Sequence, residues 1–240
     1  MNQPISTRVV WFGVTLLLFS LFVSWQTSVA LIALIFIHEH GRLFKAYSSG
    51  LNAHGVASIP FIGGLAVFDG YVFRRKDEFD IAMGGLFFST VPVFFFFLFF
   101  LFTGDEYFAE TTKAMIAMNC VFLLPMGGFD GGRIVNALSY SISRKIGILC
   151  LVLSVCLAIY LTSQHFFLFF LIFFSLLDLS HKTTHPTDKQ NMSFTQWIWA
   201  FLRLSCVIGL MGYIYFQVEL FDGSGALKSP LTGKDLLVDR

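Results

Sequence analysis

Charged residues are scarce in this sequence. Asp, Glu, Lys and Arg together make up 13% of its 240 residues, about half of the roughly 25% that is usual for soluble domains. Hydrophobic residues make up 56% of the chain, and 31 residues are phenylalanine. A chain with so little charge and so much apolar surface suits a lipid environment, so the composition predicts a polytopic membrane protein.

Paired cysteines and basic blocks are also missing. The four cysteines fall singly inside apolar runs, without the spacing of a metal knuckle or a disulfide framework, so we interpret them as small buried hydrophobic residues. The formal net charge is +1, and no basic block alternates with aromatics, so we expect no nucleic-acid partner. No secretory cleavage site follows the first apolar run, which we therefore interpret as a retained membrane span.

The apolar runs set the expected fold class. A helix that crosses a bilayer needs about 20 apolar residues, and the sequence predicts an all-α fold with six or seven transmembrane helices. We expect a core over residues 1–145, additional transmembrane helices over 146–216 and a polar tail over 217–240. The predicted spans are 9–23, 27–47, 81–103, about 112–133, 146–162, 166–179 and 197–216.

One segment breaks this helical pattern. Residues 48–80 contain a β-rich stretch with the sequence Ile59-Pro60-Phe61-Ile62-Gly63-Gly64, which predicts a small membrane-associated β hairpin over about 53–73. The hairpin either dips into the membrane, covered by protein, or lies on the membrane surface. The charged stretch from Asp69 to Asp80 is expected to lie in water.

The distribution of Lys and Arg predicts the orientation. Basic residues gather at Arg8, 45–76, 144–145 and 182–189, on alternate sides of the predicted spans. This pattern puts the N-terminus in the cytoplasm, and it puts His38 and Asp130 toward the cytoplasmic side. Arg203 lies inside the last span, where it either reaches the interface or pairs with an acidic residue such as Asp178.

The densest ionisable chemistry in an apolar setting is at His38 and Glu39. Zinc hydrolases often carry His-Glu-x-x-His on a helix, where the two histidines share a face and the glutamate serves as general base. His38 and Glu39 fit that pattern, but Arg42 stands at the position of the second histidine. His38 as an ordinary buried histidine is a weaker reading, because ionisable residues inside spans are seldom without a role.

Four elements resemble the site-2 protease family, whose members are intramembrane zinc metalloproteases that cut transmembrane segments of other proteins. The resemblance covers roughly residues 10–145, in the order and spacing of the family. The elements are His38-Glu39-x-x-Arg42, Ile59 to Gly64, Ala82-Met83-Gly84-Gly85, and Leu123-Leu124-Pro125 followed after four residues by Asp130-Gly131-Gly132-Arg133.

The resemblance implies roles for individual residues. His38 and Asp130 would bind zinc, and Glu39 would be the catalytic base. A transmembrane segment of a membrane-protein substrate would unwind near Pro125 and pair with the hairpin as an added strand. The hairpin residues implied in substrate binding are Ile59, Pro60, Phe61, Ile62, Gly63 and Gly64.

Two positions depart from the family pattern. Phe122 stands where the family often has an asparagine that helps to bind substrate. Arg42 matters more, because catalytic zinc sites use three protein ligands and His38 and Asp130 supply only two. An always-charged guanidinium would also lie within a helical turn of the metal.

Two explanations of Arg42 remain open at this point. A third ligand could come from His40, His54 or Asp69, although His40 should point about 200° away from His38 on a straight helix. Alternatively, Arg42 is itself the cation and pairs with Glu39 and Asp130 where zinc would lie.

The sequence therefore supports two functions. One is a zinc protease that acts on transmembrane segments, with Arg42 either rescued by another ligand or particular to this chain. The other is an inactive relative that binds a membrane partner. A transporter built on broken helices is a weaker alternative, because no second half repeats the first.

Overall fold

The computed structural model describes residues 5–57, 65–69, 72, 74–126, 129–164 and 189–221. These residues form seven helices and two short strands. In chain order they are α1 (Ile5–Ser20), α2 (Trp25–Ser48), β1 (Asn52–Ala57), β2 (Leu65–Asp69), α3 (Arg75–Thr103), α4 (Glu106–Phe122), α5 (Asp130–Ile142), α6 (Arg144–Gln164) and α8 (Phe194–Leu220).

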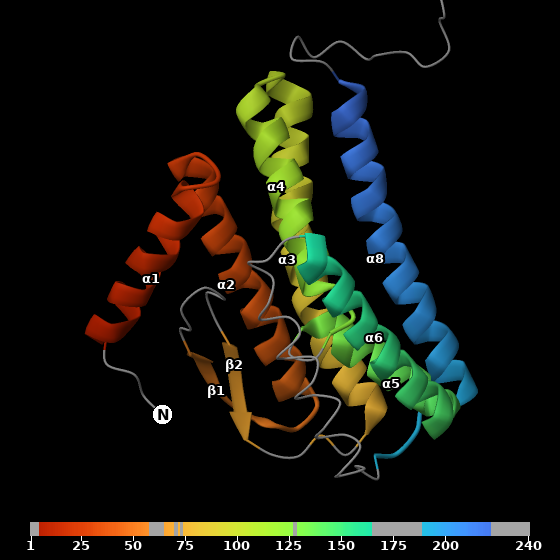
Figure 1. Ribbon diagram of the computed structural model, residues 1–240. Coiled ribbons are helices and arrows are strands. Elements are labelled where there is room, and N and C mark those ends of the chain that lie inside the picture. Colours follow the sequence, from red (N-terminus) through yellow and green to blue (C-terminus); the bar gives the residue numbers. More distant parts are fainter. Residues whose placement is uncertain are drawn as a thin grey trace, which may run out of the picture.

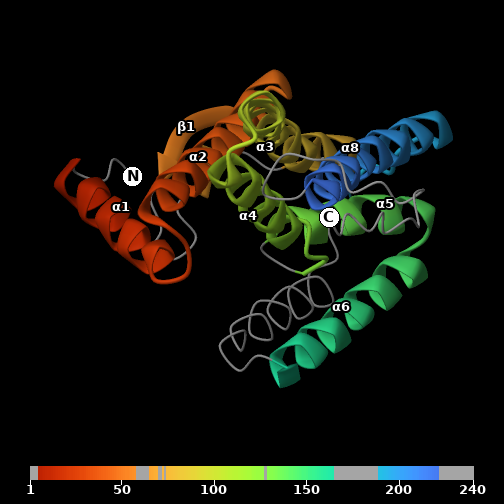
Figure 2. The same ribbon diagram turned by 90° about the horizontal axis from the view of Figure 1, so that it is seen from above.

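Helix α3 is the centre of the arrangement. It packs against α2, α4, α5 and α8, while α1 contacts α2 and α6 contacts α5. Figure 1 shows α1 and α2 as the two arms of an inverted V beside α3 and α4, with α8 on the other side. In the view from above, α1 and α6 lie at the margins of the molecule (Figure 2). The site described below lies where α2, α3, α4 and α5 meet.

Local capping signals explain several helix boundaries. Ser24 accepts a hydrogen bond from a backbone N–H in the first turn of α2, and Ser193 forms a capping box with Gln196 at the start of α8. Gly104 takes up a left-handed conformation, with φ of 67°, that ends α3. Asp105 follows at once and caps α4. Such caps satisfy the free N–H groups of the first turn, and the pair at 104–105 lets α3 and α4 lie side by side.

Glycines allow α2 and α3 to approach closely. A Cβ atom built on Gly41 would lie 2.5 Å from the carbonyl oxygen of Gly84, and one on Gly84 would lie 2.7 Å from that of Gly41. A Cβ on Gly85 would lie 2.6 Å from Nε2 of His38. All three distances are shorter than real contacts, so any side chain here would push the helices apart. The prediction that Gly84 and Gly85 permit close packing is confirmed.

Among the described residues, three helices are long and apolar enough to cross a membrane. They are α2, α3 and α8, with mean hydropathies of 1.2, 2.3 and 1.6 over their best windows. Large apolar side chains are exposed along them, including Phe94, Phe99 and Phe201. Exposed apolar surface on this scale is what a lipid environment covers. The prediction of a helical membrane protein is therefore supported.

The two strands pair antiparallel, from Asn52 opposite Asp69 to Ala57 opposite Leu65. The register shifts between Ala53 and Gly55. Both strands lie beside α2 (Figure 1). Residues 58–64 between them lie outside the described part of the chain, and these include all six residues predicted to bind substrate.

The expectation that the charged stretch from Asp69 to Asp80 lies in water is wrong for the start of α3. The helix begins at Arg75, and the Arg75 and Asp77 side chains are buried. Arg74 Nε donates to Asp77 at 2.7 Å, and Arg75 Nε donates to Asn191 Oδ1 at 3.0 Å. The charges are buried because they are paired, in part with the segment that leads into α8.

Arg203 on α8 also has a different partner from the one proposed. Its Nη1 donates to Asp80 at 2.9 Å, and its guanidinium lies over the ring of Phe79. Asp80 also accepts from Lys76 at 2.8 Å, so α8 is tied to the first turns of α3. Asp178 lies outside the described residues.

Two further boundaries differ from expectation. Helix α8 continues to Leu220, beyond the start of the tail expected at 217, and Val218 in its last turn is buried. The predicted fifth span lies within α6, whereas the span predicted at 166–179 lies outside the described residues.

Candidate functional site: a buried arginine between two carboxylates

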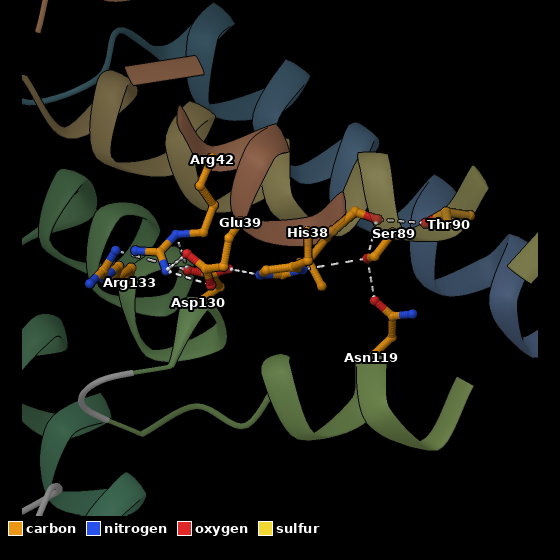
Figure 3. Close-up of polar contacts among 9 residues, drawn as sticks. His38, Glu39, Arg42, Ser89, Thr90, Asn119, Asp130 and Arg133 are labelled. Carbon is orange, nitrogen blue, oxygen red and sulfur yellow. Dashed lines mark hydrogen bonds and ion pairs between the residues drawn. The ribbon is translucent and has the colours of Figure 1, made fainter. Parts of the chain in front are cut away.

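Four helices supply the site (Figure 3). His38, Glu39 and Arg42 project from the buried face of α2, as positions i, i+1 and i+4 of a helix do. Ser89 comes from α3. Asp130 is the first residue of α5, whereas α4 ends at Phe122. The span predicted at about 112–133 is therefore divided between two helices, with a break before Asp130.

His38 and Asp130 are in direct contact. Nε2 of His38 lies 2.7 Å from Oδ2 of Asp130, and the two residues are 1% and 4% exposed. A carboxylate oxygen accepts, so Nε2 carries the proton and donates it to Asp130. The sequence separation is 92 residues, and the contact exists because α5 begins against the middle of the α2–α3 pair.

The other side of His38 leads to a short polar chain (Figure 3). Nδ1 lies 3.5 Å from Oγ of Ser89. Ser89 donates to Oδ1 of Asn119 and lies 3.0 Å from the carbonyl of Leu86, while Asn119 Nδ2 donates to the carbonyl of Met115. The one hydroxyl proton is thus directed away from His38. The chain orients the imidazole and does not activate Ser89 as a nucleophile, which would need a base on that proton.

Arg42 joins the two carboxylates. Its Nη1 donates to both oxygens of Glu39, at 3.1 and 3.0 Å, and its Nε lies 3.4 Å from Oδ1 of Asp130. The three side chains are 5% exposed or less. This is the pairing that the sequence left open as one explanation of Arg42.

A second arginine approaches the same aspartate from the outside. Nη1 of Arg133, one turn further along α5, lies 4.0 Å from Oδ1 of Asp130, and its side chain is 30% exposed. Glu39 and Asp130 thus contribute two negative charges, and Arg42 and Arg133 two positive ones. The two carboxylates therefore face two guanidiniums, which lowers the free-energy cost of burying them.

The described residues do not fit a catalytic zinc ion. Such an ion needs three protein ligands and an open position for water. His38 and Asp130 are bonded to each other, Glu39 is held by Arg42, and a guanidinium fills the space between the carboxylates. Within the described ranges no three His, Cys, Asp or Glu side chains lie close enough to share a metal.

Of the three proposed replacement ligands, only His40 has a described side chain. His40 is exposed, and its Nδ1 contacts the carbonyl of Phe36 at 2.8 Å, so it points away from the site as the helical spacing predicted. His54 is in β1 and Asp69 is in β2, and only their backbones are described. Their role as ligands stays untested.

The turn between α4 and α5 completes the site. Phe122 is buried, and its ring centre lies 4.1 Å from that of His38. Pro125 lies in the turn, half-buried. A Cβ on Gly131 would lie 2.0 Å from the carbonyl oxygen of Leu123, so only glycine lets α5 begin this close to the end of α4. The Asp-Gly pair therefore has a packing reason in this fold.

Sequence reasoning missed Ser89 and Asn119, which are both fully buried. The available signal was a hydroxyl and an amide inside apolar helices, where polar groups need partners. The resemblance would place an asparagine at Phe122, and Asn119 lies one helical turn before that position. Asn119 does not contact His38 directly, because Ser89 lies between the two side chains.

No protein-family model matches this sequence, and no curated protein matches it significantly.

Proposed function

We propose that this protein is a catalytically inactive relative of the site-2 proteases. It binds a transmembrane segment of a membrane-protein partner and does not cleave it. The supporting observation is the position of Arg42, whose guanidinium contacts both Glu39 and Asp130. Both oxygens of Glu39 accept hydrogen bonds from Arg42, so the carboxylate that the resemblance implies as the catalytic base is already engaged by a permanent cation.

The proposal includes a membrane arrangement. The protein is multi-pass, with six or seven transmembrane helices, a hairpin that adjoins α2 and an N-terminus in the cytoplasm. The three long apolar helices and the alternation of basic segments support this arrangement. The partner segment lies along the hairpin, at Ile59 to Gly64, and near Pro125.

An active zinc protease is the second candidate. One observation favours it, namely that His38 and Asp130 meet across 92 residues of sequence as the family resemblance requires. This candidate needs Arg42 to leave the site and a third ligand to enter it.

Zinc content separates the two candidates. The protein would be purified in detergent and its bound zinc measured beside Arg42→His and beside Arg42→His combined with Asp130→Asn. We expect no zinc in the unchanged protein, about one equivalent in Arg42→His, which completes a set of three ligands, and none in the double variant.

Two other outcomes of the zinc measurement would contradict the proposal. One zinc per molecule in the unchanged protein would overturn the proposal in favour of the protease. If Arg42→His gains no zinc although it remains folded, the site is not a zinc site altered at one position, and the relationship to zinc proteases falls.

A further inference from the structure

A cavity of about 600 Å³ lies between the α1–α2 turn and α4, and none of its lining residues belongs to the site around Arg42. Figure 1 shows the α1–α2 turn, the start of α4 and the end of α8 at the same, upper end of the molecule. Polar and apolar side chains line the cavity together, and the polar ones are Ser20, Ser24, Thr27, Glu110 and Lys113. The cavity therefore offers polar contacts to a ligand in an otherwise apolar protein.

The hydroxyl groups of this cavity offer acceptors to a ligand. Oγ of Ser20 donates its proton to the carbonyl of Leu16 at 2.8 Å, and Oγ of Ser24 donates to Oγ1 of Thr27 at 2.9 Å. A hydroxyl has one proton and two lone pairs, so the remaining capacity of Ser20 and Ser24 is for accepting hydrogen bonds. Oγ1 of Thr27 also lies 3.1 Å from Oγ1 of Thr111, which holds the turn against α4. A ligand that donates hydrogen bonds suits these walls.

The charged residues around the cavity favour a cationic donor. Glu110 and Lys113 are three positions apart on α4, and side chains at this spacing are neighbours on a helix surface. Lys113 Nζ lies 2.8 Å from Oε1 of Glu219 on α8, and the two side chains are 38% and 48% exposed. Asp105 and Glu106, at the start of α4, are acidic as well. Carboxylates thus outnumber the one ammonium of these segments, and a bound cation would reduce their mutual repulsion.

The cavity lies at the depth expected for lipid headgroups. Trp25 begins α2, which is long and apolar enough to span a membrane, and its side chain is 65% exposed. Tryptophan at the end of a span is typical of the membrane–water interface. Leu21 and Phe22 also line the cavity and are 76% and 86% exposed, which suits side chains that contact acyl chains. A ligand with a polar head and apolar chains fits this position.

We propose that this cavity binds the headgroup of phosphatidylethanolamine. The ammonium of the lipid donates to the carboxylate of Glu110 and to the hydroxyl oxygens of Ser20 and Ser24, and its phosphate accepts from Lys113. Two methylene groups separate the ammonium from the phosphate, which matches the short spacing of Glu110 and Lys113. A choline headgroup has no N–H to donate, and a glycerol headgroup brings no cation. This lipid site goes beyond the proposed function and does not depend on it.

Native mass spectrometry of the full-length protein in detergent measures this selectivity. Phosphatidylethanolamine, phosphatidylcholine and phosphatidylglycerol with identical acyl chains are titrated separately, and the fraction of protein with bound lipid gives each affinity. Glycerophosphoethanolamine, which is the headgroup without acyl chains, is added as a competitor. The variants are Glu110→Gln, Lys113→Gln and the matched control Glu106→Gln, which changes a carboxylate of α4 that does not line the cavity. Circular dichroism checks that each variant keeps its helical structure.

We expect phosphatidylethanolamine to bind about five- to tenfold more tightly than phosphatidylcholine, which is the effect of one hydrogen bond. Glu110→Gln should remove this preference, because it deletes the charged acceptor of the ammonium. Lys113→Gln should weaken the binding of both lipids, because both carry the phosphate. Glu106→Gln should leave the two affinities unchanged.

Three other results would overturn the proposed lipid site. If phosphatidylethanolamine binds no more tightly than phosphatidylcholine, or if Glu110→Gln keeps the preference, the cavity does not recognise the amine. Tightest binding of phosphatidylglycerol would make it a site for anionic lipids instead. Displacement of the lipid by glycerophosphoethanolamine at a similar concentration would show that the ligand is a soluble phosphoamine and not a lipid.

Discussion

Replacing Arg42 by glutamine should cost more stability than any surface substitution. The Arg42–Glu39 pair is 5% exposed on both sides and joined by two hydrogen bonds of 3.1 and 3.0 Å. Removing one partner of a buried ion pair costs about 3–5 kcal/mol, because the remaining buried charge loses its compensation. Glu39 would lose both hydrogen bonds from Arg42, whereas Asp130 keeps its hydrogen bond from His38 and the nearby Arg133.

Part of this stability should return when the Glu39 carboxylate is neutralised as well. Glu39→Gln alone should cost less than Arg42→Gln, because Asp130 still compensates Arg42 at 3.4 Å. The double variant Arg42→Gln/Glu39→Gln should be more stable than Arg42→Gln alone, with a coupling energy of roughly 1–3 kcal/mol. Such a recovery would show that Arg42→Gln destabilises the protein through the buried charge of Glu39 and not through lost packing of the arginine side chain.

The assay is reversible unfolding in mixed micelles with increasing SDS, followed by circular dichroism. The free energy of unfolding is compared for the unchanged protein, the two single variants and the double variant. The account of the site is refuted if Arg42→Gln costs less than about 1 kcal/mol, the range of an exposed ion pair, or if the two single effects simply add.

Two further predictions concern the contacts around the site. Gly41→Ala places a methyl group 2.5 Å from the carbonyl of Gly84 and should lower the free energy of unfolding by about 1–3 kcal/mol. Gly209→Ala on α8, where no atom lies within 4 Å, is the matched control and should not lower it in the same assay. Ser89→Ala removes the donor to buried Asn119 and should cost about 1–3 kcal/mol, while the same change in an Asn119→Leu background should cost clearly less. Equal losses in the two backgrounds would show that the two side chains are not coupled.

Much of the helical layout follows from local signals. The apolar runs predicted the cores of α1, α2, α3, α4 and α8, and these helices differ from the expected spans mainly at their ends. The sequence did not predict that α3 begins at Arg75, six residues before the expected span. Charged residues are expected to lie in water unless their partners in the fold are known. Those partners, Asn191 and the segment before α8, lie more than a hundred residues away.

The residues of the site could be predicted from the sequence, but the contacts between them could not. The motif spacing brought out His38, Glu39, Arg42 and Asp130 as the notable residues, because helical periodicity and scarce intramembrane charge are visible in a sequence. Their mutual contacts were not visible. The 2.7 Å contact of His38 with Asp130 depends on where α5 begins after the break, and the roles of Ser89 and Asn119 depend on how α3 and α4 face α2.

The sequence by itself determined that this is a helical membrane protein with one polar cluster in an apolar setting. Composition and periodicity are properties of short stretches, and they need no knowledge of distant contacts. Only the tertiary structure decided what Arg42 does. The same guanidinium would repel a metal, reach the interface or link two carboxylates, depending on which groups lie within about 4 Å, where Coulomb attraction in a buried site is strong. Glu39 and Asp130 both lie within that distance, on helices that the fold brings together.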